Sequence, residues 1–224
     1  LRHYDMAAFK VTHAVDRWTA GGMLHYNTAL DGLVLRATIL HHRADVLADL
    51  TSAFYEQITQ LGIGQAGFSK KLKLSTDDTI FYVTSIEYTW DSLILAAEYS
   101  QYRGTFRSSQ PELIEHTRLN QQKGYIQLGY NLNDWSAFAA SYGFINDPED
   151  PYGLKNAENG RMHYESFQKS ITLSARFDLS DYWIIKMEGH LIDGTMLVYE
   201  LDNRKHPDLE RYWTLLAAKT TLAF

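Results

Sequence analysis

The strongest constraint on the fold is a period-two alternation of apolar and polar residues. Between Ser166 and Asp178 one face carries Phe167, Ile171, Leu173, Ala175 and Phe177, and the other carries Gln168, Ser170, Thr172, Ser174 and Arg176. A β-strand has this period, because successive side chains point to opposite faces, whereas helical patterns repeat about every 3.6 residues. The pattern therefore predicts a strand with one apolar and one polar face.

The same alternation recurs along the chain. It is found in the segments 24–30, 33–39, 80–89, 93–100, 125–132, 138–144, 182–191 and 211–224. Together with 166–178 these segments predict about nine strands, with a weaker tenth over Met6–Ala14.

The connections between these segments also alternate. Short turns are expected at Asp31-Gly32, Trp90-Asp91, Asn131–Asp134 and Leu179–Asp181, and long polar loops at 43–77, 104–122, 146–164 and 194–210. Tight turns at one rim and long loops at the other are typical of a transmembrane antiparallel up-and-down β-barrel. This is the fold class that we expect.

A soluble sandwich or barrel is the alternative, because it shows the same period. Strands of about 10–13 residues, longer than the usual 5–6, favour the membrane barrel. Aromatic residues near the strand ends, where a bilayer places its aromatic belts, favour it as well. They are Tyr88, Trp90, Trp135, Tyr142, Phe144, Tyr182, Trp183, Tyr212 and Trp213.

Composition excludes several classes of function. The chain has no cysteine, so disulfides, thiolate metal sites and cysteine nucleophiles are excluded. Its net charge of -6 argues against binding nucleic acid through phosphate contacts. The adjacent pair His41-His42 would point to opposite faces of a strand, so it does not predict a metal site. We expect no cofactor.

The last residues, YWTLLAAKTTLAF, resemble the C-terminal strand of Gram-negative outer-membrane proteins. Phe224, Leu222, Ala218 and Leu216 fit its alternating apolar pattern, and Thr220 departs from it. The stretch DYWIIKMEGHLIDG is similar to the ends of larger porins. The resemblance implies a bacterial outer-membrane location, contact with outer-membrane lipid, and recognition of Phe224 by the barrel assembly machinery. A homotrimer or a partner protein would fit the porin family.

We expect residues 1–224 to form a single transmembrane β-barrel domain. Porins usually have about 16–18 strands, so this chain would lack N-terminal strands of a larger barrel. A complete small barrel is the alternative, and it requires the strand over Met6–Ala14, because bacterial barrels close with an even number of strands.

Charged and polar residues at strand centres should point inward, because charges are costly on the lipid face. The pore-lining candidates are His25, Arg36, Glu87, Glu98, Gln127, Arg176, Lys186, Glu188, His190 and Lys219. Inside a wide lumen they would set ion selectivity, and inside a narrow one they would form a closed salt-bridge network.

A helix is predicted in the first long loop. Val46, Leu47, Leu50, Phe54, Ile58 and Leu61 recur at helical spacing, with Asp45 as a cap and Gly62 at the end. Such a helix would fold into the lumen or pack on the barrel rim. The following GxGxxG over 62–67 is interpreted as a glycine-rich loop, because no βαβ pattern surrounds it.

Passive diffusion of small hydrophilic solutes through a charge-lined lumen is the function that we predict. A barrel that serves as a scaffold or sleeve for another envelope protein is the second hypothesis. An outer-membrane hydrolase is a third, with Ser170, Ser174 and His190 on polar faces, but no GxSxG motif supports it. We therefore expect no enzyme activity.

Overall fold

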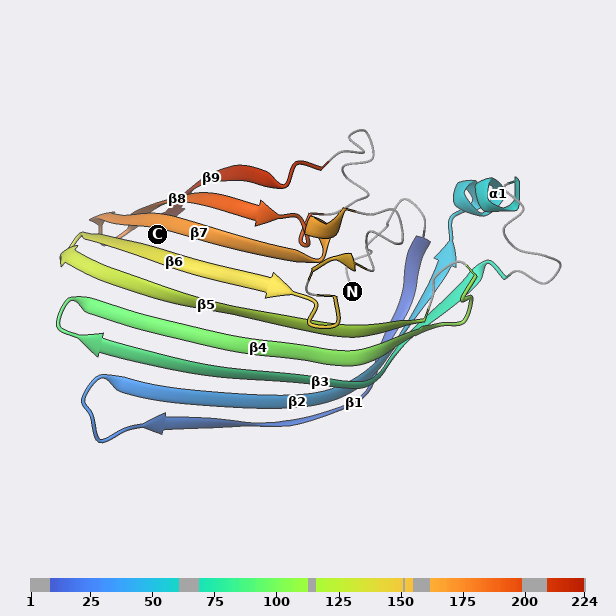
Figure 1. The fold of residues 1–224 in the computed structure, drawn as a ribbon, viewed down its shortest axis with the longest axis horizontal. Coiled ribbons are helices and arrows are strands. Elements are labelled where there is room, and N and C mark those ends of the chain that lie inside the picture. Colours follow the sequence, from blue (N-terminus) through green and yellow to red (C-terminus); the bar gives the residue numbers. More distant parts are fainter. Residues whose placement is uncertain are drawn as a thin grey trace. The chain divides into compact units, whose positions relative to one another are not determined.

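The computed structural model describes residues 9–60, 69–112, 116–150, 152–154, 162–198 and 209–223, without the side chains of Thr117 and Leu119. These residues form a nine-stranded sheet in which the strands follow chain order, as Figure 1 shows. The strands are β1 (Phe9–Asn27), β2 (Leu33–Leu50), β3 (Lys71–Trp90), β4 (Leu93–Ser108), β5 (Thr117–Asn133), β6 (Ser136–Asn146), β7 (Phe167–Ser180), β8 (Trp183–Gly194) and β9 (Tyr212–Leu222). This confirms the all-β, up-and-down arrangement.

The helical content is small. Helix α1 (Ser52–Gln60) lies between β2 and β3, and the 3-10 helix η1 (His163–Glu165) precedes β7. No helix in the described part of the chain is long and apolar enough to cross a membrane.

The chain divides into two compact units. Unit 1 takes in the chain up to Gly22 together with 39–82 and 102–120, and unit 2 takes in 23–38, 83–101 and 121 onward. Strands β1 to β5 contribute residues to both units.

Unit 2 contains the short turns, and each turn is bonded to the next hairpin. The amide of Thr89 donates to Gly32 O at 2.9 Å, that of Asn131 to Ser92 O at 2.9 Å, and that of Asp178 to Trp135 O at 2.8 Å. The short connections therefore gather at one end of the strands, as Figure 1 shows. The predicted turn at Asp31-Gly32 is confirmed, and those predicted at Trp90-Asp91, Asn131–Asp134 and Leu179–Asp181 are present but lie slightly later, at Asp91-Ser92, Asp134-Trp135 and Asp181-Tyr182.

Gly32 is required by this arrangement of turns. Its φ of 81° lies in the left-handed region, and a Cβ atom there would stand 2.0 Å from Thr89 O. Only a residue without a side chain lets the first turn lie against the end of β3.

The registers of β5 to β9 confirm the predicted faces. Directly opposed residues of antiparallel strands place their side chains on the same face. One such row runs through Leu128, Ala140, Leu173, Gly189 and Leu216. Leu173 is 63% exposed and Leu216 is 82% exposed. This outward face is apolar and uncovered by protein, as a lipid-facing wall must be.

Unit 1 corrects the predicted loops 43–77 and 104–122. Much of both segments is strand, since β2 reaches Leu50, β3 starts at Lys71, β4 reaches Ser108 and β5 starts at Thr117. The charges that suggested loops are paired across strands. Arg43 Nε lies 3.3 Å from Asp77 Oδ1, and Arg107 Nε lies 3.0 Å from Asp77 Oδ2. Cross-strand pairs of opposite charge support continued sheet.

The predicted helix is present but shorter than the spacing suggested. Residues 46–50 belong to β2, and Asp45 is a strand residue rather than a cap. The amide of Leu50 donates to Lys70 O at 2.7 Å, so strand pairing continues where helical spacing predicted a helix. In α1 itself, Ile58 is buried. The predicted helix end at Gly62 and the glycine-rich segment 62–67 lie outside the described residues.

The segment predicted as a weaker tenth strand, Met6–Ala14, does not form a strand of its own. Its described residues belong to β1, which continues without a break to Asn27. The stretch between the predicted segments 6–14 and 24–30 includes Arg17, which is hydrogen-bonded to Asp45 on β2. Pairing across the sheet thus holds the stretch in the strand.

Candidate functional site

The polar face of unit 2 carries the predicted pore-lining residues of β5 to β9. One row consists of Gln127, Ser141, Thr172, His190 and Leu215, on the opposite face of the sheet from Leu173 and Leu216. Leu215 is an apolar departure in this row. The described strands of unit 2 are therefore apolar on one side and polar on the other, which is the construction of a transmembrane β-sheet.

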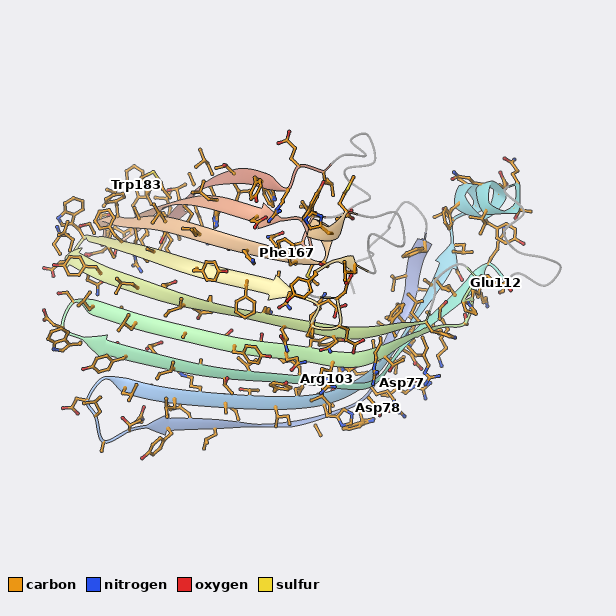
Figure 2. All side chains as sticks on the ribbon, in the orientation of Figure 1. Asp77, Asp78, Arg103, Glu112, Phe167 and Trp183 are labelled. Carbon is orange, nitrogen blue, oxygen red and sulfur yellow. The ribbon has the colours of Figure 1, made fainter. Side chains whose placement is uncertain are left out.

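Figure 2 shows how aromatic residues mark the ends of these strands. Phe167 begins β7 and Trp183 begins β8, and the two lie toward opposite ends of the antiparallel pair. The indole Nε1 of Trp183 donates to Thr220 Oγ1 at 2.7 Å, which explains the polar residue in the otherwise apolar pattern of β9. Amphipathic rings at both ends suit the two interfaces of a bilayer.

Arg36 and Glu87 pair across β2 and β3. Arg36 Nη1 lies 3.5 Å from Glu87 Oε2, and both side chains are partly exposed. The pair offsets two mid-strand charges without burying them. Glu98 on β4 and His25 on β1 also belong to unit 2, and His25 Nε2 lies 3.1 Å from Asn27 Oδ1.

His190 is held between two polar neighbours. Its Nδ1 lies 2.9 Å from Thr172 Oγ1, and its Nε2 lies 3.4 Å from Glu188 Oε2. Neither Ser170 nor Ser174, the predicted serine candidates, stands opposite His190 in the register. The interactions link β7 to β8 and fix the imidazole ring.

Arg176, Lys186 and Lys219 stand in one row across β7, β8 and β9. Arg176 is directly opposite Lys186, and Lys186 is directly opposite Lys219. We call these residues the cationic row. Arg176 is hydrogen-bonded to Asp178, with Nε to Oδ1 at 2.7 Å and Nη2 to Oδ2 at 2.9 Å. Among the described residues, no carboxylate lies within 4.0 Å of Lys186 or Lys219.

A hollow of about 370 Å³ opens in unit 2, and most of the side chains at it belong to the polar face. Its polar lining residues include Glu98, Lys123, Tyr125, Gln168 and Ser170. Gly143, which is directly opposite Ser170, has no side chain and therefore adds no bulk to this part of the hollow. The hollow is open, lined by both signs of charge, and wide enough for water and small solutes.

A second charged cluster lies at the far end of β8, near the last described turn. Arg211 Nε donates to Asp193 Oδ1 at 2.6 Å, and its Nη2 donates to Oδ2 at 3.2 Å. The guanidinium also lies 4.8 Å from the ring of Tyr212. The cluster anchors the start of β9.

Unit 1 contains a charged cluster that sequence reasoning missed. Buried Asp45 accepts hydrogen bonds from Ser75 Oγ at 2.7 Å and from Arg17 Nε at 2.7 Å, and Lys73 Nζ lies 3.1 Å away. The Ser75 hydrogen bond is the main cause that lowers the pKa of Asp45 to about 2, with help from Arg17 and Lys73. From His41 onward the face of β2 that carries Leu35 and Ile39 bears the charges of Arg43, Asp45 and Asp49 instead, so this cluster lies beyond the membrane-spanning part of the strand.

Asp77 and Asp78, labelled in Figure 2, belong to the same extension of the sheet. Asp78 has a φ of 48°, which is unusual within a strand and marks an irregularity there. The opposite signs of Arg17 and Asp45, spaced 28 residues apart, were the available sequence signal, but only a register could have paired them.

Comparisons with known proteins give likeness of structure and no sequence family. No family model matches the chain, and no curated protein does either. The NanC porin is similar at a TM-score of 0.44 and 8% identity, over 97% of both chains. The CymD monoaromatic hydrocarbon channel is similar at 0.44 and 10%, over 99% of this chain and 72% of that one.

OmpT of Vibrio cholerae is also similar, with a TM-score of 0.39 and 10% identity, over 78% of this chain and 54% of OmpT. The two-faced strands, the short turns at one end and the aromatic strand ends together have the construction of a transmembrane β-sheet.

Proposed function

We propose that this chain forms the wall of an outer-membrane diffusion channel for small hydrophilic solutes. Solutes would pass along the polar face of the strands and be filtered by size and by the fixed charges of that face. The proposal involves no chemical step and no cofactor.

One observation carries the proposal. The same strands that expose Leu173 and Leu216 on the apolar face expose Lys186, Glu188 and Lys219 on the other. An exposed charged face is unfavourable against lipid and favourable against water. Lys186 and Lys219 have no carboxylate partner among the described residues. A sealed interior would require such charges to be paired, so the unpaired lysines favour a water-filled lumen.

Single-channel conductance of the purified full-length gene product in a planar bilayer tests the proposal. Stepwise openings that persist at fixed voltage are expected from a water-filled lumen. A matched heat-denatured sample controls for contaminating channels. A protein that is folded in the membrane and yet silent would overturn the proposal in favour of a barrel filled by a partner protein.

A further inference from the structure

From the cationic row, we propose that the polar face binds anions that carry several negatively charged oxygens, such as phosphate esters or polycarboxylates. This inference rests on the proposed function, because it names the class of solute that the channel would favour. It begins from the register, in which Arg176 opposes Lys186 and Lys186 opposes Lys219.

The row is unfavourable without a ligand. Side chains at directly opposed positions start about 4.5–5.5 Å apart at Cβ, and like charges there destabilise a sheet. Asp178 compensates Arg176 through two hydrogen bonds. The carboxylate of Glu188, one row away, lies 3.4 Å from His190. Lys186 and Lys219 are thus left opposite each other and exposed.

The surroundings leave room for an anion. The row continues from Arg176 to Ala137 on β6, and the next row holds Ala139, Ser174, Glu188 and Ala217, with the Glu188 carboxylate turned to His190. The alanine and serine side chains of these rows are short, and Lys186 and Lys219 are both exposed. The two exposed ammonium groups of Lys186 and Lys219, at directly opposed positions, can contact several oxygens of one anion, which spreads its negative charge over both cations.

The polar face on which the row lies distinguishes it from Lys169, the lysine of β7. Lys169 faces the outward side, in the row of Phe144, Asp193 and Tyr212. Its charge contributes to the strand end and not to the polar face. Lys169→Gln therefore offers a control for charge removal elsewhere on β7, changing the net charge by one where each lysine of the row also contributes one.

Binding of inorganic phosphate to the full-length protein in detergent, measured by titration calorimetry at low salt, tests the proposal without requiring conduction. The double variant Lys186→Gln/Lys219→Gln should bind at least about tenfold more weakly, whereas Lys169→Gln should bind like the wild type. The circular dichroism of each variant establishes that the sheet has formed. Absence of phosphate binding by the folded wild type, or equal affinity in the double variant, overturns the proposal.

The reversal potential in a salt gradient provides the second readout. Loss of both lysines should lower the anion-to-cation permeability ratio several-fold, and Lys169→Gln should leave the ratio unchanged. An open channel without phosphate binding removes this inference and keeps the diffusion channel. Phosphate binding by a silent protein removes the diffusion channel and keeps the anion site.

Discussion

Ser75 on β3 donates a hydrogen bond of 2.7 Å to Asp45 on β2, and this bond joins two strands across a segment whose charges resemble those of a loop. Arg17 on β1 and Lys73 on β3 complete the neutralisation of the buried carboxylate. The cluster thus pairs three strands of unit 1, and its protonation should be visible in the stability of the protein.

Acid should weaken unit 1 through Asp45. Its pKa is about 2 in the folded chain against an ordinary 3.8, so its contribution to stability is complete above about pH 4 and disappears as the pH falls toward 2. The contribution amounts to at most about 2 kcal/mol. Urea unfolding should show that the free energy of unfolding falls less between pH 5 and pH 2.5 in Asp45→Asn than in the wild type. An equal fall in both proteins would contradict the role assigned to Asp45 in acid sensitivity.

The two faces should differ in their tolerance of charge. Leu173→Lys places an ammonium group on the apolar face and should cost about 2–4 kcal/mol of folding free energy in a bilayer. Ser174→Lys, at the next position on the polar face, should cost little. Folding yield into lipid vesicles measures both. If the two variants fold equally well, the faces are assigned wrongly.

Gly32 should resist substitution. Gly32→Ala forces a side chain into a backbone conformation of φ 81° and against Thr89 O, so it should cost about 1–3 kcal/mol. Gly22→Ala is the control, because no atom lies within 4 Å of a Cβ atom there. The temperature of unfolding in detergent should fall for the first variant and stay near the wild type for the second. A similar fall in both would assign the effect to glycine loss in general.

Phe224 should act in assembly. The residue lies outside the described part of the chain, and its role stays a prediction from the resemblance of the last strand. Deleting it should slow the appearance of folded protein in the outer membrane of living cells, while Phe224→Tyr should preserve assembly because an aromatic end is kept. Normal assembly of the deletion would remove the terminal residue from the proposed signal.

The faces of the strands could be predicted from sequence because each depends on the period of its own segment. Leu173 and Ser174 fall on opposite sides of any β-strand, whatever its neighbours are. The short turns were predicted for the same reason, since Gly32 and its neighbours carry a local signal.

The strand extensions of unit 1 could not be predicted, because their stability comes from partners distant in sequence. The sequence predicted Asp45 as a helix cap, whereas in the structure its partners are Arg17 on β1 and Ser75 on β3. The cationic row could not be predicted for the same reason. Arg176, Lys186 and Lys219 were each predicted on the polar face, and only the registers place them opposite one another.

The order of the sheet has a consequence for how such a protein grows. Every strand pairs with its neighbour in the chain, and the turn of one hairpin is bonded to the strand that follows it. Each hairpin thus pairs with the next one along a free strand edge. Adding or removing a hairpin does not make any other connection cross the sheet. Duplication of a short gene segment could widen the wall by two strands while preserving the alternation that separates lipid from water.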